Sequence, residues 1–197
     1  MRFLKIAFIC VSISTLAGCN LLNSSTSSTS PDLLNDCNAS ATETYFDDNT
    51  SQALAPGDEA AQQIQPGGDV GASLALNQVV IHMGTQGVST VTLAVYEGGS
   101  YTDPTSGQVI ASTTLSSGLG NSSLSAPVTF NFSPAPSLQV GGQYFLVLSG
   151  TGGTIELSTS SVQTLPDFLM TYTGGSWNGP WTGDMSISFS YFVTCST

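Results

Sequence analysis

The chain has 197 residues and a formal net charge of −11, because 13 acidic residues are set against two basic residues and one neutral histidine. Nucleic-acid binding depends on Lys and Arg side chains that neutralise phosphates, so this composition excludes nucleic acid as a partner. The same shortage of cations disfavours phosphate-bearing nucleotides and electrostatic docking on anionic lipid.

The N-terminus has the pattern of an export signal. Two basic residues, Arg2 and Lys5, precede an apolar run that is too short to span a membrane permanently. The run ends in Leu16-Ala17-Gly18-Cys19, which resembles the lipobox of bacterial lipoproteins. The resemblance implies that residues 1–18 are a signal peptide and that the Cys19 thiol carries a lipid, which anchors the protein to a membrane. The alternative is an ordinary secretory signal with a chance cysteine at the cleavage site.

Removal of the signal changes the charge of the chain. Arg2 and Lys5 are its only basic residues, so the formal charge falls from −11 to −13 when both leave. Such self-repulsion favours solubility, and only His82 remains as a side-chain counter-cation. In the lipoprotein family, a residue other than aspartate after the lipidated cysteine, here Asn20, implies sorting to the outer membrane of the cell envelope.

A tether and a single domain follow the lipobox. Residues 19–36 include the polar run NSSTSSTS at 23–30, which has no apolar side chain to bury and is typical of a flexible linker. Residues 37–197 are enough for one domain with one core. If Cys19 is lipidated, Cys37 and Cys195 are the cysteines left in the mature chain, and an exported setting favours a disulfide between them. The alternative is two unpaired thiols.

The folded part is predicted to be all-β. Helical signals are scarce, and the best helix candidate, residues 58–63, is short and opens beside Pro56 and Gly57. Apolar and polar residues instead alternate with a period of two in runs that glycine, proline and asparagine separate. These runs are residues 79–83, 91–96, 109–115, 128–132, 144–148 and 187–193. The pattern predicts an antiparallel β-sandwich, with 144–148 as a central strand because both of its faces are apolar.

The order of the strand motifs resembles a family of jelly-roll domains found in bacterial surface-anchored proteins. The motifs are LALNQVVIHMG, STVTLAVYEG, GQVIASTTL, APVTFNFSPAPSLQVGGQYFLVLSG and DMSISFSYFV, spread from about Ala61 to Val193. The stretch after LVLS, residues 154–165, is shorter than in that family. The resemblance implies a jelly-roll-like sandwich and a role in adhesion or glycan recognition.

A segment rich in aromatic, glycine and asparagine residues is the first candidate for a ligand site. Trp177 and Trp181 lie within residues 174–183, and Tyr172 and Tyr101 are candidates to extend them. A tryptophan in a loop presents a flat apolar face and one N–H donor, which suits stacking on a sugar ring. The alternative is that one or both tryptophans cap the end of the core.

Carboxylates are the second candidate for a ligand site. Asp58 and Glu59 precede the expected first core strand and Asp184 opens the last one, and these strands are commonly neighbours in a jelly roll. Calcium binds several oxygen ligands and needs no histidine or cysteine, so Asp184 with Glu59 or Asp58 is a candidate structural calcium site. The alternative is a set of solvated carboxylates that favour solubility.

No catalytic arrangement is recognisable in the sequence. A zinc site needs further His or Cys ligands beside the lone His82, and a Ser-His-Asp triad needs a G-x-S-x-G elbow or an equivalent, which is absent. No spacing selects a carboxylate pair for glycoside hydrolysis, so a hydrolase is not expected. The sequence favours a lipid-anchored envelope module that binds a glycan or another surface ligand. The alternative is an assembly lipoprotein that binds a protein partner through an exposed strand edge.

Overall fold

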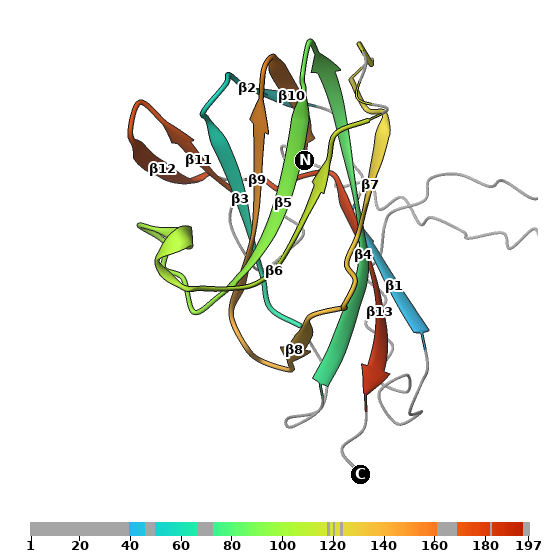
Figure 1. The fold of residues 1–197 in the computed structure, drawn as a ribbon. Coiled ribbons are helices and arrows are strands. Elements are labelled where there is room, and N and C mark those ends of the chain that lie inside the picture. The colour runs from blue at the N-terminus through green and yellow to red at the C-terminus, as the bar shows by residue number, and fades with distance from the viewer. Residues whose placement is uncertain are drawn as a thin grey trace, which may run out of the picture.

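The computed structural model describes residues 40–45, 50–66, 73–117, 119, 121–122, 124–160, 169–181 and 183–194. These residues form strands and one short 3-10 helix, η2 (Pro104–Ser106) (Figure 1). The strands are β1 (Ser40–Tyr45), β2 (Thr50–Leu54), β3 (Glu59–Ile64), β4 (Ser73–Gln86), β5 (Thr90–Glu97), β6 (Gln108–Leu115), β7 (Pro127–Asn131), β8 (Ser137–Gln139), β9 (Tyr144–Thr151), β10 (Thr154–Thr159), β11 (Leu169–Thr173), β12 (Ser176–Trp181) and β13 (Ile187–Thr194).

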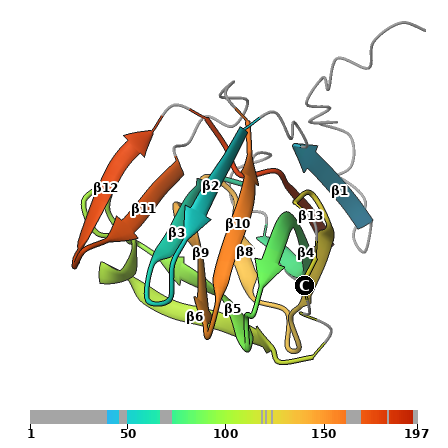
Figure 2. The same ribbon diagram turned by 90° about the horizontal axis from the view of Figure 1, so that it is seen from above.

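The described strands make two antiparallel sheets that pack face to face. One is seven-stranded, with the order β1-β13-β4-β10-β2 and with β7 and β8 paired to β4; the other is six-stranded, with the order β12-β11-β3-β9-β5-β6. From above, β1 and the β11–β12 hairpin lie at opposite ends of the molecule (Figure 2). The expected fold class, an all-β antiparallel sandwich, is confirmed.

The burial of strands β5 and β9 follows their sequence pattern. In β5, Val91, Leu93 and Val95 are fully buried, whereas the residues between them are partly exposed. This is the alternation expected of a strand with one face in a core. The first five residues of β9, Tyr144 to Leu148, are all buried, and β9 lies between β3 and β5, as the sequence predicted.

The weak helix signal at residues 58–63 does not become a helix. Glu59–Ile64 is strand β3, paired with both β9 and β11. A six-residue run without strong periodicity is compatible with either a helix or a strand. Here the pairing with two neighbouring strands makes the segment a strand.

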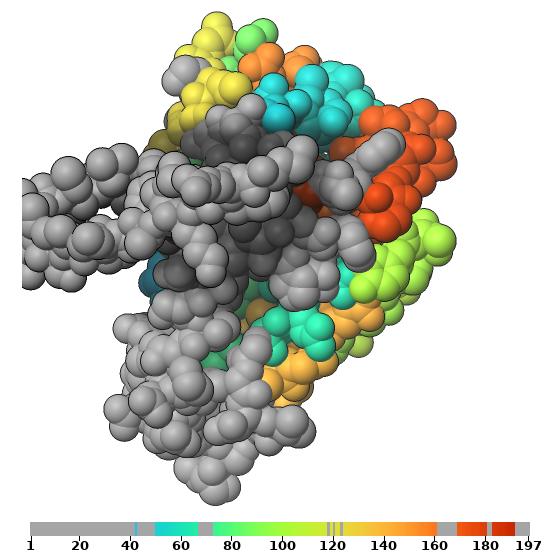
Figure 3. Space-filling model, turned by 180° about the vertical axis from the view of Figure 1, so that it is seen from behind, coloured from blue at the N-terminus to red at the C-terminus, as the bar shows by residue number. Residues whose placement is uncertain are grey.

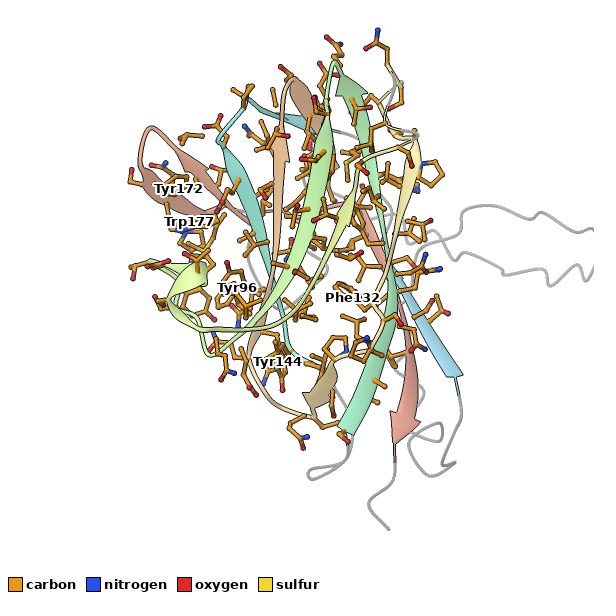
Figure 4. The ribbon with its side chains drawn as sticks, viewed as in Figure 1. Tyr96, Phe132, Tyr144, Tyr172 and Trp177 are labelled. Atoms are coloured by element: carbon orange, nitrogen blue, oxygen red, sulfur yellow. The ribbon has the colours of Figure 1, made fainter. Side chains whose placement is uncertain are left out.

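The main core lies between the two sheets. Leucine, isoleucine, valine, phenylalanine and methionine side chains from both sheets meet there, as do Phe132 and Tyr144 (Figure 4). Its buried members include Leu54, Leu76, Val79, Ile81, Met83, Leu93, Val95, Phe130, Leu146, Leu148, Leu157, Met185, Ile187 and Phe189.

A buried polar side chain joins the two sheets through this core. The side-chain carbonyl of Gln62 on β3 accepts a hydrogen bond from the Met185 backbone N–H at 3.0 Å, and its amide donates to the Asp184 carboxylate at 3.3 Å. The Asp184 backbone carbonyl accepts from the Ser160 N–H at 2.8 Å. Asp184 is only 1% exposed, and these bonds satisfy polar groups that water does not reach.

Several sequence predictions concern residues outside the described part of the chain. These are the signal peptide 1–18, the lipidated Cys19, the tether 19–36, and the disulfide between Cys37 and Cys195. They remain predictions. Within the described residues, no helix has the length and apolar character needed to cross a membrane.

Candidate binding face

The six-stranded sheet has a second apolar cluster on the side that faces away from the core. Ala61 on β3, Phe145 and Val147 on β9, and Met170 on β11 are all buried and contact one another there. They alternate with residues that point into the main core, so β3, β9 and β11 bury side chains on both faces. Since water would otherwise reach this outer surface, other segments must cover it.

A loop covers one side of the cluster. The segment from Gly98 to Gly107, which contains η2, folds back over β9, and the Tyr101 ring meets the Phe145 ring edge-on with centroids 6.4 Å apart and planes at 86°. A Cβ on Gly99 would lie 2.8 Å from the Phe145 ring and closer still to the Pro104 carbonyl, so only glycine fits there. The loop is ordered by Asp103, whose carboxylate accepts from the Thr105 N–H at 3.0 Å and its hydroxyl at 2.7 Å.

The β11–β12 hairpin covers the other side of the cluster. It turns at Gly174 and Gly175, both with positive φ, and returns as Ser176–Trp181. The hairpin and the η2 loop lie side by side along one edge of the molecule, orange-red and yellow-green in the view from behind (Figure 3). Trp177 packs against the cluster from the hairpin, and Tyr96 packs against it from β5.

Aromatic side chains from distant parts of the sequence therefore gather on one surface. Tyr172 and Trp177 lie opposite each other in the hairpin, with ring centroids 5.4 Å apart and planes tilted by 59° (Figure 4). Both are partly exposed, and Tyr101 is 44% exposed. Together with Tyr96 and Phe145, these residues are called the outer aromatic face. Rings that are half covered are held in place but still offer contact area to a ligand.

The structure brings most of the predicted aromatic residues together, but not in the predicted setting. Trp177 lies in strand β12 and not in a loop, because residues 176–181 pair with β11. It contacts the outer cluster and not the end of the main core, which differs from the capping interpretation. The backbone of Trp181 ends β12, and its side chain lies outside the described part of the structure.

Two carboxylates lie beside the aromatic rings. Glu59 pairs with Tyr172 across β3 and β11, so both point to the outer side of the sheet. Partial burial raises the pKa of Glu59. The pKa of Tyr96 is also raised, first by burial and then by the negative charges of Glu59 and Asp103. The outer aromatic face therefore carries a negative potential.

Sequence reasoning missed Tyr96, Phe145 and Asp103. Tyr96 and Phe145 read as ordinary strand residues, and they meet because β5 pairs with β9 in the register Tyr96 to Phe145. The one available signal was that the strand at Tyr144 to Leu148 is apolar on both faces, which requires a second covered surface.

The carboxylates predicted to bind calcium are not brought together. Glu59 points outward from β3, whereas Asp184 lies in the core against Gln62, which points to the opposite face of the same strand. Asp58 accepts from the Ala55 N–H at 3.1 Å and closes the turn before β3. In the described part of the chain, no group of three or more His, Cys, Asp or Glu residues is placed to hold a metal ion.

The reason is the position of the strand that follows Asp58. The prediction placed it beside the last strand, but β3 belongs to the six-stranded sheet and β13 to the seven-stranded sheet. The last strand pairs with β1 and β4 instead.

Comparison with known proteins supports the fold and goes no further. No protein-family model and no curated protein match the chain. A structure of the clostridial cysteine protease Cwp84 after propeptide cleavage matches with a TM-score of 0.53 at 10% identity, over 79% of this chain and 40% of that one. A second structure contains the cysteine protease and lectin-like domains of Cwp84, a surface layer associated protein of Clostridium difficile. It matches with a TM-score of 0.48 at 11% identity, over 73% of this chain and 34% of that one. This chain thus spans less than half of either one.

Proposed function

We propose that the protein is a lipid-anchored module of the bacterial cell envelope that binds a glycan through its outer aromatic face. The observation that carries the proposal is the convergence of Tyr96, Tyr101, Tyr172 and Trp177 on one partly exposed surface. These residues come from two distant stretches of the sequence, 96–101 and 172–177, and burial of the core alone does not require them on the outside of a sheet.

The chemistry of the face suits a sugar. The apolar C–H face of a sugar ring stacks on an aromatic ring, and Tyr and Trp add a polar atom at the rim. The Glu59 carboxylate, which points to the same side, is an acceptor for sugar hydroxyls. Because the chain has no Lys or Arg after position 5, we expect a neutral glycan and not an anionic one.

Two further features support this location and role. The lipobox-like Leu16-Ala17-Gly18-Cys19 motif supports anchoring in the envelope, with the outer membrane as the proposed site. The fold is similar to part of Cwp84, which is described as a surface layer associated protein with a lectin-like domain. No catalytic step is part of the proposal.

The proposal is tested by screening the purified protein on a glycan array beside two variants. Trp177→Ala removes a ring from the outer aromatic face, and the matched control Leu124→Ala removes an apolar side chain that is 40% exposed elsewhere. We expect binding to neutral glycans that weakens about tenfold or more in Trp177→Ala and is unchanged in the control. A folded protein that binds no glycan, or a Trp177→Ala variant that binds as well as the parent, would contradict it.

One observation favours the second candidate, an assembly lipoprotein that binds a protein partner. Strand β6 is an edge of the six-stranded sheet, has no charged residue or proline within Gln108–Leu115, and exposes 48% of Val109. Such an edge is open to strand addition. A Val109→Lys variant, which places a charge on the edge, is expected to abolish co-purification of that partner if this candidate is correct.

A further inference from the structure

The register of the six-stranded sheet aligns one residue from every strand in a single row on the outer side. Thr114 on β6 pairs with Thr92 on β5, and Thr92 pairs with Ser149 on β9. Ser149 pairs with Glu59, Glu59 with Tyr172, and Tyr172 with Trp177. Directly paired residues project to the same side of a sheet, so the six side chains form a continuous line perpendicular to the strands.

The two ends of this row differ in chemistry. The β11–β12 end consists of the Tyr172 and Trp177 rings, whereas the β6–β5 end consists of hydroxyls, with the Thr92 and Thr114 oxygens 2.8 Å apart. A second hydroxyl pair, Thr90 and Thr151 at 2.7 Å, flanks this end. All four threonines are partly or fully exposed. A threonine that shares one hydrogen bond with its neighbour retains acceptor capacity for a ligand.

The row is long compared with a single sugar ring. Neighbouring strands lie about 4.8 Å apart, so six strands place the Thr114 and Trp177 positions about 24 Å from each other. A ligand that contacts only the two aromatic rings would leave most of this length unused.

We propose that the row is an extended binding site for a neutral oligosaccharide that lies across the strands. One sugar stacks on Tyr172 and Trp177, Glu59 and Ser149 accept hydrogen bonds from the next, and further sugars meet Thr92 and Thr114. This inference rests on the proposed function and specifies its ligand as a chain of several sugars and not a terminal monosaccharide.

Neutrality of the ligand follows from the charges beside the row. Glu59 lies within it and Asp103 lies near Tyr96 next to it. A sulfated or uronic-acid chain would approach these carboxylates without any Lys or Arg to offset the repulsion, because the chain has neither after position 5.

The test is the dependence of affinity on glycan length. Calorimetric titrations use three neutral series from disaccharide to hexasaccharide: β-1,4-linked glucose, β-1,4-linked N-acetylglucosamine and α-1,4-linked glucose. The proteins are the parent, Trp177→Ala, the double variant Thr92→Val/Thr114→Val, and the control Thr129→Val, which changes an exposed threonine on the other sheet. Valine keeps the shape of threonine, and removal of both hydroxyls leaves no unpaired partner. A far-ultraviolet spectrum and an unfolding curve establish that each variant is folded.

In at least one series, we expect the parent to bind the hexasaccharide about tenfold or more tightly than the disaccharide. The Thr92→Val/Thr114→Val variant should lose most of that gain yet bind the disaccharide as the parent does. Trp177→Ala should weaken binding at every length, and Thr129→Val at none.

Two results would overturn the inference while leaving glycan binding intact: an affinity that does not change with length, or a double variant that keeps the full gain. Absence of binding in all three series also overturns it, and the glycan array then decides separately whether the protein binds any glycan. Equal affinity for a uronic-acid hexasaccharide would remove the restriction to neutral chains.

Discussion

The outer surfaces of the two sheets are built differently. On the seven-stranded sheet, polar side chains pair on the outward side: Gln78 donates to Asn131 across β4 and β7 at 2.9 Å, and the Thr42 and Ser190 hydroxyls lie 3.3 Å apart across β1 and β13. On the six-stranded sheet, the outward residues of β3, β9 and β11 form a buried apolar cluster that Tyr96 and Trp177 cover.

The difference shows that the two sheets bury apolar side chains to different extents. The seven-stranded sheet contributes to the main core, which lies between the sheets. The six-stranded sheet adds a second, smaller core held by a loop and a hairpin, and its covering aromatic rings remain partly exposed. We attribute that additional construction to the binding function proposed above.

The largest expected effect concerns the outer cluster itself. Phe145→Ala should lower the free energy of unfolding by about 3–5 kcal/mol, because it leaves a cavity under Tyr101 and the η2 loop. Thr129→Ala, on the exposed side of the other sheet, should change it by no more than about 0.5 kcal/mol. Urea denaturation measures both. Similar values for the two variants would show that the outer cluster is not a second core.

A smaller effect on stability is expected for the Glu59 carboxylate, which differs from an ordinary surface carboxylate because it is partly buried. Because burial raises the pKa of Glu59 above its ordinary value of 4.5, the folded state disfavours the ionised form, and stability is lost as the pH rises through the raised pKa. Glu59→Gln should therefore stabilise the protein at neutral pH, by less than about 1 kcal/mol after solvent screening.

This gain should disappear below the ordinary pKa of glutamic acid, where Glu59 is protonated in both states. Melting temperatures at about pH 7 and about pH 4 measure it. Glu156→Gln, on β10, controls for the loss of one negative charge. A Glu59→Gln variant that is destabilised at neutral pH would contradict the assignment.

The smallest expected effect is that of calcium. Since Glu59 and Asp184 lie on opposite sides of β3, addition of calcium after EDTA treatment should leave the melting temperature unchanged. Differential scanning calorimetry measures this directly. A rise of several degrees would indicate a calcium site formed by other residues, because bound ligand stabilises the folded state.

The pattern of the sequence predicted most of the sandwich but little of the binding face. Strands β4, β5, β7 and β13 follow from apolar alternation, β6 follows from a shorter run, and β9 follows from a run that is apolar on both faces. Strand β3 carried the best of the scarce helix signals, because its six residues EAAQQI have no alternation, and it is a strand because it pairs with both β9 and β11.

The candidate site illustrates the same limit. Trp177 and Tyr172 were recognisable because tryptophan beside glycine and asparagine is unusual, yet the sequence placed them in a loop and gave no reason to add Tyr96 or Phe145. The carboxylates proposed for calcium lie apart for a related reason. The prediction required two segments to share one sheet, and the sequence does not specify in which sheet a strand lies.

By itself, the sequence determined the fold class, the absence of Lys and Arg after position 5 and the lipobox-like motif that suggests an anchored protein. These properties follow from composition, from a short motif and from the alternation of residues within single strands, so they do not depend on which strands pair. The tertiary structure alone decided that Glu59 faces outward, that Asp184 is buried against Gln62, and that threonines and aromatic rings align across six strands. Pairing and register between distant strands depend on the packing of the whole chain, because a shift of one residue would send each of these side chains to the other face.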